Sequence, residues 1–285
     1  MRHFRTLSAV AALLFPPTLA AGQPATLPQS FQSDGVAIRY VVRGTGPAVL
    51  LVHGFSVNAA LNWVAPGVVD SLATSYTVIA PDLRGHGSSD KPHDASAYGK
   101  PFVDDLVRLL DHLQLTRVHV VGYSMGGIIA LNLLVRHPER VMSAVIGGAG
   151  WRSPEMGAPE RVVRWEQQMG RAVSGEATIM EILAEPGAPA PPPPVAAVMN
   201  ANDPVALRAV LRGNASLAVT EQELRTSTIP VLVLVGDQDW ALADAERAAA
   251  LLGNAQLQRI PGADHLGALM FPQFIGGIKR FLAAR

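Results

Sequence analysis

The segment that most constrains the fold of this chain is Gly122-Tyr123-Ser124-Met125-Gly126-Gly127, which lies between a strand-like and a helix-like run. Residues 118–121 are mostly β-branched, as in a buried strand, and residues 128–135 are apolar and compatible with a helix. A serine at such a junction indicates a nucleophile elbow, a sharp turn that exposes a hydroxyl. Its neighbours must be small because the elbow backbone is strained. We therefore predict that Ser124 is a nucleophile.

A serine hydroxyl needs a base beside it, a carboxylate behind the base, and hydrogen-bond donors for the oxyanion. The chain supplies candidates in the order serine, acid, histidine. The apolar run 231–235 ends in Gly236-Asp237-Gln238-Asp239, so either aspartate could be the acid. His265 follows a further short strand-like run and is the candidate base. The backbone N–H groups of Phe55, in a His-Gly-Phe-Ser turn, and of Met125 are the candidate oxyanion donors.

Together these motifs resemble the α/β-hydrolase fold family, and the resemblance spans residues 31–285. The His-Gly-Phe turn resembles the family's oxyanion turn, and residues 81–89 resemble its D-x-R-G-x-G-x-S loop. The resemblance implies a mostly parallel sheet flanked by helices, with the site at the carboxyl ends of the strands. It also implies that the acid is Asp239, because the family's acid lies three residues after the glycine. Asp237 is then a turn residue.

Apolar runs alternate with helical stretches along most of the chain. This alternation independently predicts an α/β fold with a mostly parallel central sheet and right-handed crossovers. We expect residues 31–150 and 228–285 to form this core. The expected strands are 36–43, 48–53, 76–81, 117–123, 141–146, 231–235 and 256–260, and the expected helices are 58–73, 98–114, 125–136 and a terminal segment.

Residues 151–227 lack strand-like runs and are rich in methionine, alanine and proline. We predict that they form a small helical cap, with helices over 161–172 and 176–184. Asp203 before Pro204 and the Thr220-x-x-Glu223 pattern indicate the starts of two more helices. The four prolines 191–194 predict an extended polyproline segment, either a stiff strap within the cap or a docking segment for another protein.

Several aromatic residues are candidates for the wall of a substrate pocket, with ordinary core or cap packing as the alternative for each. A pocket lined by them suits a hydrophobic acyl or aromatic group. Beside Phe55 and Met125, the candidates are Trp63, Tyr123, Trp151, Trp165 and Trp240.

Composition narrows the class of protein further. The chain has 285 residues, 49% of them hydrophobic, enough for one large core. Lysine plus arginine equals aspartate plus glutamate at 23 each, which argues against nucleic acid as a partner and against an electrostatic membrane anchor. No cysteine is present, and the histidines lack metal-ligand spacing. We predict no metal and no cofactor, a small molecule as the partner, and structural roles for His53 and His86.

The N-terminal segment has the order of a secretory signal. Residues 1–5 are basic, residues 7–15 are apolar, and small residues end at Ala20-Ala21. The apolar stretch is too short for a stable membrane span. We expect residues 1–21 to be removed, residues 22–30 to form a flexible lead-in, and the mature protein to be periplasmic or secreted.

These features predict a serine hydrolase that cleaves a carboxylic ester or related acyl bond. The alternatives are hydrolysis of a C–C, lactone or amide bond, or a haloperoxidase-like activity, on the same triad, because fold does not decide chemistry. A ligand receptor that keeps the triad without turnover is a third class. Dehalogenases and epoxide hydrolases of the family use an aspartate at the elbow, so Ser124 argues against both.

Overall fold

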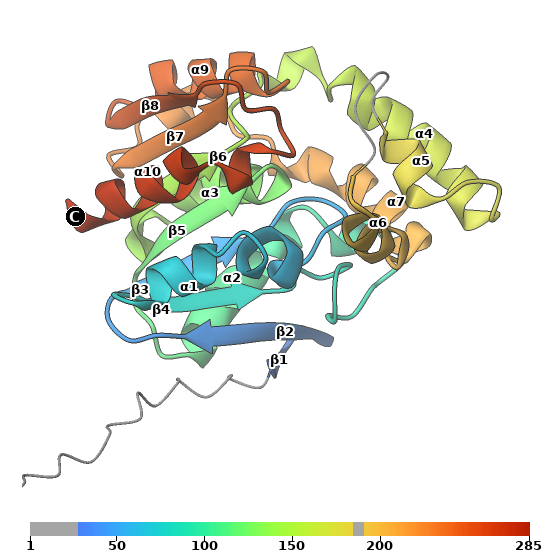
Figure 1. Ribbon diagram of the computed structural model, residues 1–285, viewed down its shortest axis with the longest axis horizontal. Helices are drawn as coiled ribbons and strands as arrows, with labels where there is room; N and C mark the ends of the chain where they lie inside the picture. Colours follow the sequence, from blue (N-terminus) through green and yellow to red (C-terminus); the bar gives the residue numbers. More distant parts are fainter. Residues whose placement is uncertain (1–27, 185–190) are drawn as a thin grey trace, which may run out of the picture.

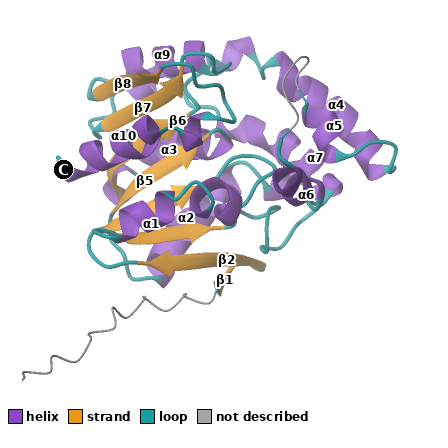
Figure 2. Ribbon diagram, viewed as in Figure 1, coloured by secondary structure: helices purple, strands orange, loops and turns teal. Residues whose placement is uncertain are grey.

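An eight-stranded sheet forms the centre of the computed structural model, which describes residues 28–184 and 191–285. The strand order is β1-β2-β4-β3-β5-β6-β7-β8; β2 runs antiparallel to both of its neighbours and all other pairs are parallel (Figures 1 and 2). The predicted fold class is confirmed. The strands are β1 (Gln29–Ser33), β2 (Val36–Arg43), β3 (Ala48–Val52), β4 (Thr77–Pro81), β5 (Val118–Tyr123), β6 (Val141–Gly147), β7 (Val231–Gly236) and β8 (Ala255–Ile260).

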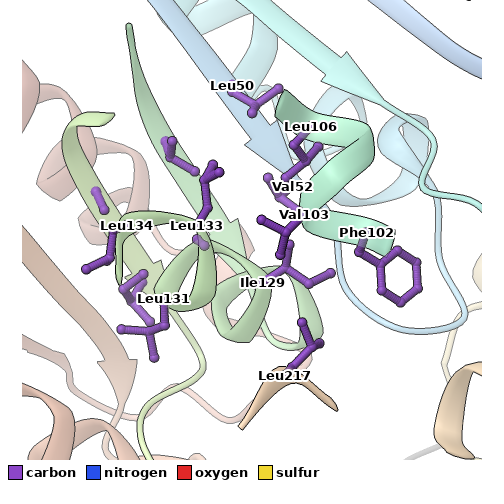
Figure 3. Packing of buried hydrophobic residues seen from close by; sticks show 14 of the residues in the cluster. Leu50, Val52, Phe102, Val103, Leu106, Ile129, Leu131, Leu133, Leu134 and Leu217 are labelled. Atoms are coloured by element: carbon purple, nitrogen blue, oxygen red, sulfur yellow. The ribbon is translucent and has the colours of Figure 1, made fainter. Parts of the chain in front are cut away.

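Helices cover both faces of the sheet. One apolar cluster joins the sheet to α2 (Lys100–His112), α3 (Met125–Arg136) and α9 (Leu242–Leu251), and another joins it to α1 (Val68–Ala73) and α10 (Pro272–Ala283). Figure 3 shows the first cluster, with Val103 and Ile129 of the helices beside Val52 of β3. Strands between two helical layers have no polar face, which explains the continuous apolar runs in the sequence.

The sequence predicted no strand before residue 36, and the structure adds β1 there. Gln29 and Ser30 pair with Tyr40 and Arg39 of β2, so these two residues belong to the sheet and not to a flexible lead-in. The sequence signal is weak there because only Phe31 and Ser33 of β1 are buried, and Ser33 is polar. The expected signal peptide lies outside the described residues.

The expected helix over 58–73 is divided in two. Ala60–Val64 forms a π-helical turn, and α1 begins only after Gly67, whose φ of 78° interrupts a right-handed helix. The division turns residue Trp63 into the interior, where its side chain is fully buried in the cluster with α1 and α10. The break therefore decides which side of this segment faces the core.

The segment between β6 and β7 contains no strand within its described residues. Its helices α4 to α7 gather at one end of the sheet (Figure 1), and α4, α5 and α7 share a small apolar cluster. Residues from Leu217 onward, among them Val219 and Leu224, pack in the main core cluster instead. The helices are α4 (Glu160–Val173), α5 (Ile179–Leu183), α6 (Pro193–Asn200), α7 (Pro204–Gly213) and α8 (Glu221–Arg225).

The proline tract 191–194 is only partly extended. The prediction of an extended segment was wrong for its last two residues. Pro192 has extended backbone angles (φ −53°, ψ 145°) and caps α6, whose first residues are Pro193 and Pro194. Proline is tolerated there because the first turn of a helix has no acceptor for its N–H groups. Residues 185–190, the preceding part of the expected strap, lie outside the described residues.

Side-chain caps fix the starts of α5, α7 and α8, whereas α4 begins after Pro159 without one. Asp203 accepts hydrogen bonds from the first turn of α7, and Thr220 forms the expected capping box of α8. A second capping box, Thr178 with Glu181, starts α5 later than residue 176, where the sequence placed it. Local capping hydrogen bonds thus account for the residues at which these three helices begin.

Candidate active site

Ser124 stands at a strained turn between β5 and α3. Its φ of 54° lies in the left-handed region, which is uncommon for a residue with a side chain. A Cβ on Gly122 would lie 2.1 Å from the carbonyl oxygen of Gly126, and one on Gly126 would lie 2.0 Å from that of Val52. The glycines therefore allow the close backbone approach that the predicted elbow requires.

The three predicted triad side chains meet at the carboxyl ends of β5, β7 and β8. Ser124 Oγ lies 2.9 Å from His265 Nε2, and His265 Nδ1 lies 2.9 Å from each carboxylate oxygen of Asp239. The Asp239 side chain is fully buried and also accepts the backbone N–H of Ala241 at 2.8 Å. Because an ionised carboxylate only accepts, Nδ1 carries the proton and Nε2 can accept the Ser124 O–H.

The other aspartate of the turn has a different partner. Asp237 Oδ1 accepts the backbone N–H of Gly262 at 2.8 Å, which ties the turn after β7 to the loop that carries His265. The geometry thus separates the two aspartates: Asp239 contacts the histidine and Asp237 connects two loops.

The turn that contains Phe55 lies beside the nucleophile. A Cβ on Gly54 would lie 3.3 Å from the Ser124 Cβ, and the Gly54 N–H donates to Asn62 Oδ1 at 2.9 Å. Met125 is the first residue of α3, where an N–H has no intrahelical acceptor and the helix dipole favours negative charge. Both expected oxyanion donors therefore flank Ser124. Sequence reasoning missed the supporting Asn62, whose only signal was an amide in an apolar segment.

Two buried histidines, His53 and His86, pack against the turn that contains Phe55. His53 Nδ1 donates to the Gly54 carbonyl oxygen at 2.8 Å, and its Nε2 accepts the Leu83 N–H at 2.9 Å. Burial lowers the pKa of His53 to about 4 and that of His86 to about 3. The His86 ring lies 5.3 Å from that of His53 and 5.9 Å from that of Phe55. Two neutral imidazoles thus lie beneath the turn without adding charge.

A cavity of about 440 Å³ opens between the triad and the cap. Its wall is mostly apolar, with Ser124 and His265 exposed to it. The core contributes Gly54, Phe55, Val57, Asn62, Tyr123, Ser124, Trp240, His265, Leu266 and Leu269, and the cap contributes Trp165, Met180, Glu181, Leu183, Ala184, Pro191, Ala196 and Met199.

Two of the five tentative pocket residues do not line this cavity. Trp63 is fully buried on the far side of the oxyanion turn, against α1 and α10. Trp151 is 8% exposed in the core, and its indole N–H donates to the Val219 carbonyl oxygen at 2.8 Å. Tyr123, Trp165 and Trp240 do line it. Residue type cannot separate core from pocket, because a large aromatic ring suits both.

His265 makes further contacts besides its hydrogen bond to the Asp239 carboxylate. The Tyr123 hydroxyl donates to the His265 carbonyl oxygen at 2.5 Å, and burial raises the pKa of this phenol well above its usual value, so it stays a donor. The Trp240 ring lies 3.9 Å from the His265 ring, centroid to centroid. The guanidinium of Arg161, which the sequence did not single out, lies 3.9 Å from the Trp240 centroid.

Comparison with known proteins agrees with this architecture. The family model for the alpha/beta hydrolase fold matches residues 47–270. The chain therefore belongs to the alpha/beta hydrolase fold family.

Individual relatives differ in the bonds they cleave. The chain is 43% identical over 114 residues to a 2-hydroxymuconate semialdehyde hydrolase of Pseudomonas sp. (strain CF600), covering 39% of this chain and 40% of that protein. An uncharacterized protein of Mycobacterium tuberculosis (strain ATCC 25618 / H37Rv) is 41% identical over 112 residues, covering 38% of this chain and 31% of that protein. The chain thus spans less than half the length of these curated relatives.

Similarity to solved structures extends over nearly the whole chain. The structure of Est816, described as an N-acyl homoserine lactone degrading enzyme, superimposes with a TM-score of 0.69 at 28% identity, covering 88% of this chain and 99% of that one. Proteins of the same fold also include an esterase and a meta-cleavage product hydrolase. Across residues 28–184 and 191–285, no helix has both the length and the apolar character needed to cross a bilayer.

Proposed function

We propose that the protein is a serine hydrolase that cleaves the carboxylic ester of a small, neutral, largely apolar substrate. The observation that carries the proposal is the hydrogen-bonded chain from Ser124 through His265 to Asp239, open to an apolar cavity of about 440 Å³. A cavity of this size fits a small organic ester.

The proposed reaction has two halves. Ser124 Oγ attacks the ester carbonyl carbon while His265 Nε2 takes its proton, and the N–H groups of Phe55 and Met125 bind the oxyanion. Asp239 stabilises the imidazolium, which then protonates the departing alkoxide and leaves an acyl-enzyme. Water, deprotonated by His265, attacks the acyl carbon. Collapse of the second tetrahedral intermediate releases the acid and returns the proton to Ser124.

The charges around the cavity favour a neutral substrate. Among the described residues of its wall, Glu181 carries a carboxylate and no lysine or arginine is present. The Glu181 carboxylate is exposed and bonded to Thr178, so a substrate carboxylate bound against the apolar part of the described wall would have no fixed wall cation to pair with, which is costly. Neutral esters do not meet this penalty.

Hydrolysis of a C–C bond is the second candidate. It is supported by the 43% identity to a 2-hydroxymuconate semialdehyde hydrolase over 114 residues. A semialdehyde of that kind is anionic, so this candidate conflicts with the charge of the cavity wall. Lactone hydrolysis uses the same acyl chemistry as ester hydrolysis and agrees with the likeness to Est816.

One substrate panel tests the proposal. The purified protein is given nitrophenyl esters of increasing acyl length, neutral lactones, and an anionic vinylogous diketone. We expect turnover of the esters, with lactones slower and the diketone inert. Turnover of the diketone alone would replace ester hydrolysis by the C–C candidate, and turnover of none would leave a ligand receptor.

We also propose that the protein is exported, on the evidence of the basic, apolar and small-residue order of residues 1–21. Mass spectrometry of protein recovered from its native host should find an N-terminus at Ala21 or Gly22. Cytosolic material that retains Met1 would contradict export.

A further inference from the structure

One indole ring joins the cap to the imidazole of the triad. Trp240, in the turn after β7, lies 3.9 Å from the His265 ring at an interplanar angle of 30°. The Arg161 guanidinium, from cap helix α4, lies 3.9 Å from the same indole. Both groups lie 3.9 Å from the indole centroid, so the indole connects the cap arginine to the imidazole.

Trp240 is the nearer of two aromatic rings beside the His265 ring, since the Tyr123 ring lies 5.4 Å away at an interplanar angle of 38°. Asp239 holds the Nδ1 edge, and Tyr123 holds the backbone carbonyl oxygen. Edge contacts permit the ring to tilt about the hydrogen-bond axis, whereas a face contact opposes tilting. Trp240 supplies such a contact, and with it the His265 side chain is only 11% exposed.

The indole itself is not fixed by burial. Trp240 is 40% exposed. A guanidinium over the indole face contributes a cation–π attraction and restricts the ring. Arg161 therefore gives Trp240 a second contact besides His265, and this contact comes from the cap.

We propose that Trp240 is a positioning residue for His265 and that Arg161 holds its indole in place, so that helix α4 sets the alignment of the base with Ser124. The inference rests on the proposed serine-hydrolase function. It means that the cap contributes to the chemical step as well as to the shape of the cavity.

Kinetics on nitrophenyl acetate test the role of Trp240. Trp240→Ala should lower kcat by about ten- to a hundredfold, the scale of a misaligned catalytic group, with KM nearly unchanged because the acetyl group is small. Trp240→Phe keeps a flat face and should restore most of kcat. If kcat in the alanine variant equals that of the wild type, or if only KM changes, the proposal is wrong.

A cap variant tests the role of Arg161. Arg161→Met keeps the aliphatic stem and removes the charge, and it should lower kcat by about two- to fivefold. The control is Arg212→Met, which removes another cap arginine, one that pairs with Glu166, and should retain the wild-type kcat. Equal kcat values in both variants would overturn the part assigned to Arg161.

An NMR measurement separates failure of this inference from failure of the proposed function. In a Ser124→Ala background, the ring current of Trp240 shifts the carbon-bound ring protons of His265. Trp240→Ala should abolish the shift, and Arg161→Met should reduce it. If the wild-type protein shows no turnover that depends on Ser124, the proposed function alone is overturned. An unchanged His265 resonance in both variants would overturn the stack alone.

Discussion

The two walls of the cavity are built by different physical means. On the core wall, hydrogen bonds of 2.8 to 2.9 Å fix Gly54, His265 and Asp239 at the ends of parallel strands. The cap wall offers mainly apolar side chains, such as Met180 and Met199. Directional bonds specify positions to fractions of an ångström, and apolar contacts specify mainly volume and shape. We infer that bond cleavage depends chiefly on the core wall and substrate choice on the cap wall.

Removing the nucleophile tests this division most severely. Ser124→Ala should lower turnover on every hydrolysed ester by about a millionfold while the protein stays folded, because the side chain has a chemical role and little packing. Ser88→Ala, which changes an exposed side chain, is the matched control and should keep full activity. Steady-state kinetics with circular dichroism provide the measurement. Activity of the Ser124 variant within tenfold of wild type would end the serine mechanism.

The two aspartates of one turn allow a sharper comparison within the core. Asp239→Asn should lower kcat by about ten-thousandfold at neutral pH, because an amide disfavours the productive histidine tautomer. Asp237→Asn removes a charged acceptor from the Gly262 N–H but touches no reacting group, so it should lose at most about tenfold. Both are measured on one activated ester. If the Asp237 variant is the inactive one, the acid assignment is wrong.

The histidines beneath the oxyanion turn make the core wall sensitive to acid. Burial lowers the pKa of His53 to about 4 and of His86 to about 3, so the unfolded chain binds their protons first as pH falls below about 6.5. Stability is therefore complete above that pH and declines toward the folded pKa values, by about 1.4 kcal/mol per pH unit for each histidine.

Urea unfolding at pH 7, 6 and 5 measures this decline. Replacing His86 with glutamine removes one of the two titrations, so the variant should show a shallower fall than the wild type. The difference between the two slopes isolates His86 from carboxylates that titrate in the same range. Parallel slopes would mean that folding does not lower the pKa of His86.

A cap substitution should have the smallest effect and a selective one. Trp165 stacks on Phe55 at 6.3 Å and lines the cavity. Trp165→Ala should change kcat/KM for an octanoyl ester relative to an acetyl ester by about tenfold, the scale of hydrophobic-pocket discrimination. Val173→Ala, exposed on the same helix, is the control. Equal loss on both esters would contradict a selectivity role for the cap wall.

The core could be predicted from sequence far better than the cap. Strand-like runs, the elbow glycines and the order of Ser124, Asp239 and His265 are local patterns, and parallel strands bring their carboxyl ends together regardless of intervening length. The cap's features depend on tertiary contacts. Nothing local distinguishes Trp63, which is buried in the core, from Trp165, which lines the cavity.

The proline tract and Arg161 show the same limit. Proline favours both an extended backbone and a helix start, so the prediction of an extended segment over residues 191–194 failed where α6 begins. Arg161 is one of several arginines on an amphipathic helix. Its contact with Trp240 joins positions that are 79 residues apart in the chain and depends on how the cap rests on the core.

Trp151 has a consequence for how proteins of this kind can diversify. Its backbone N–H donates to the Asp244 carbonyl oxygen and its indole N–H to that of Val219, so the departing and returning ends of the insertion meet at one place on the core. The flanking strands β6 and β7 are neighbours in the sheet. A segment whose ends are already together can be lengthened, shortened or replaced at little entropic cost. Evolution can thus replace the cap as a unit while the strands and the triad stay unchanged.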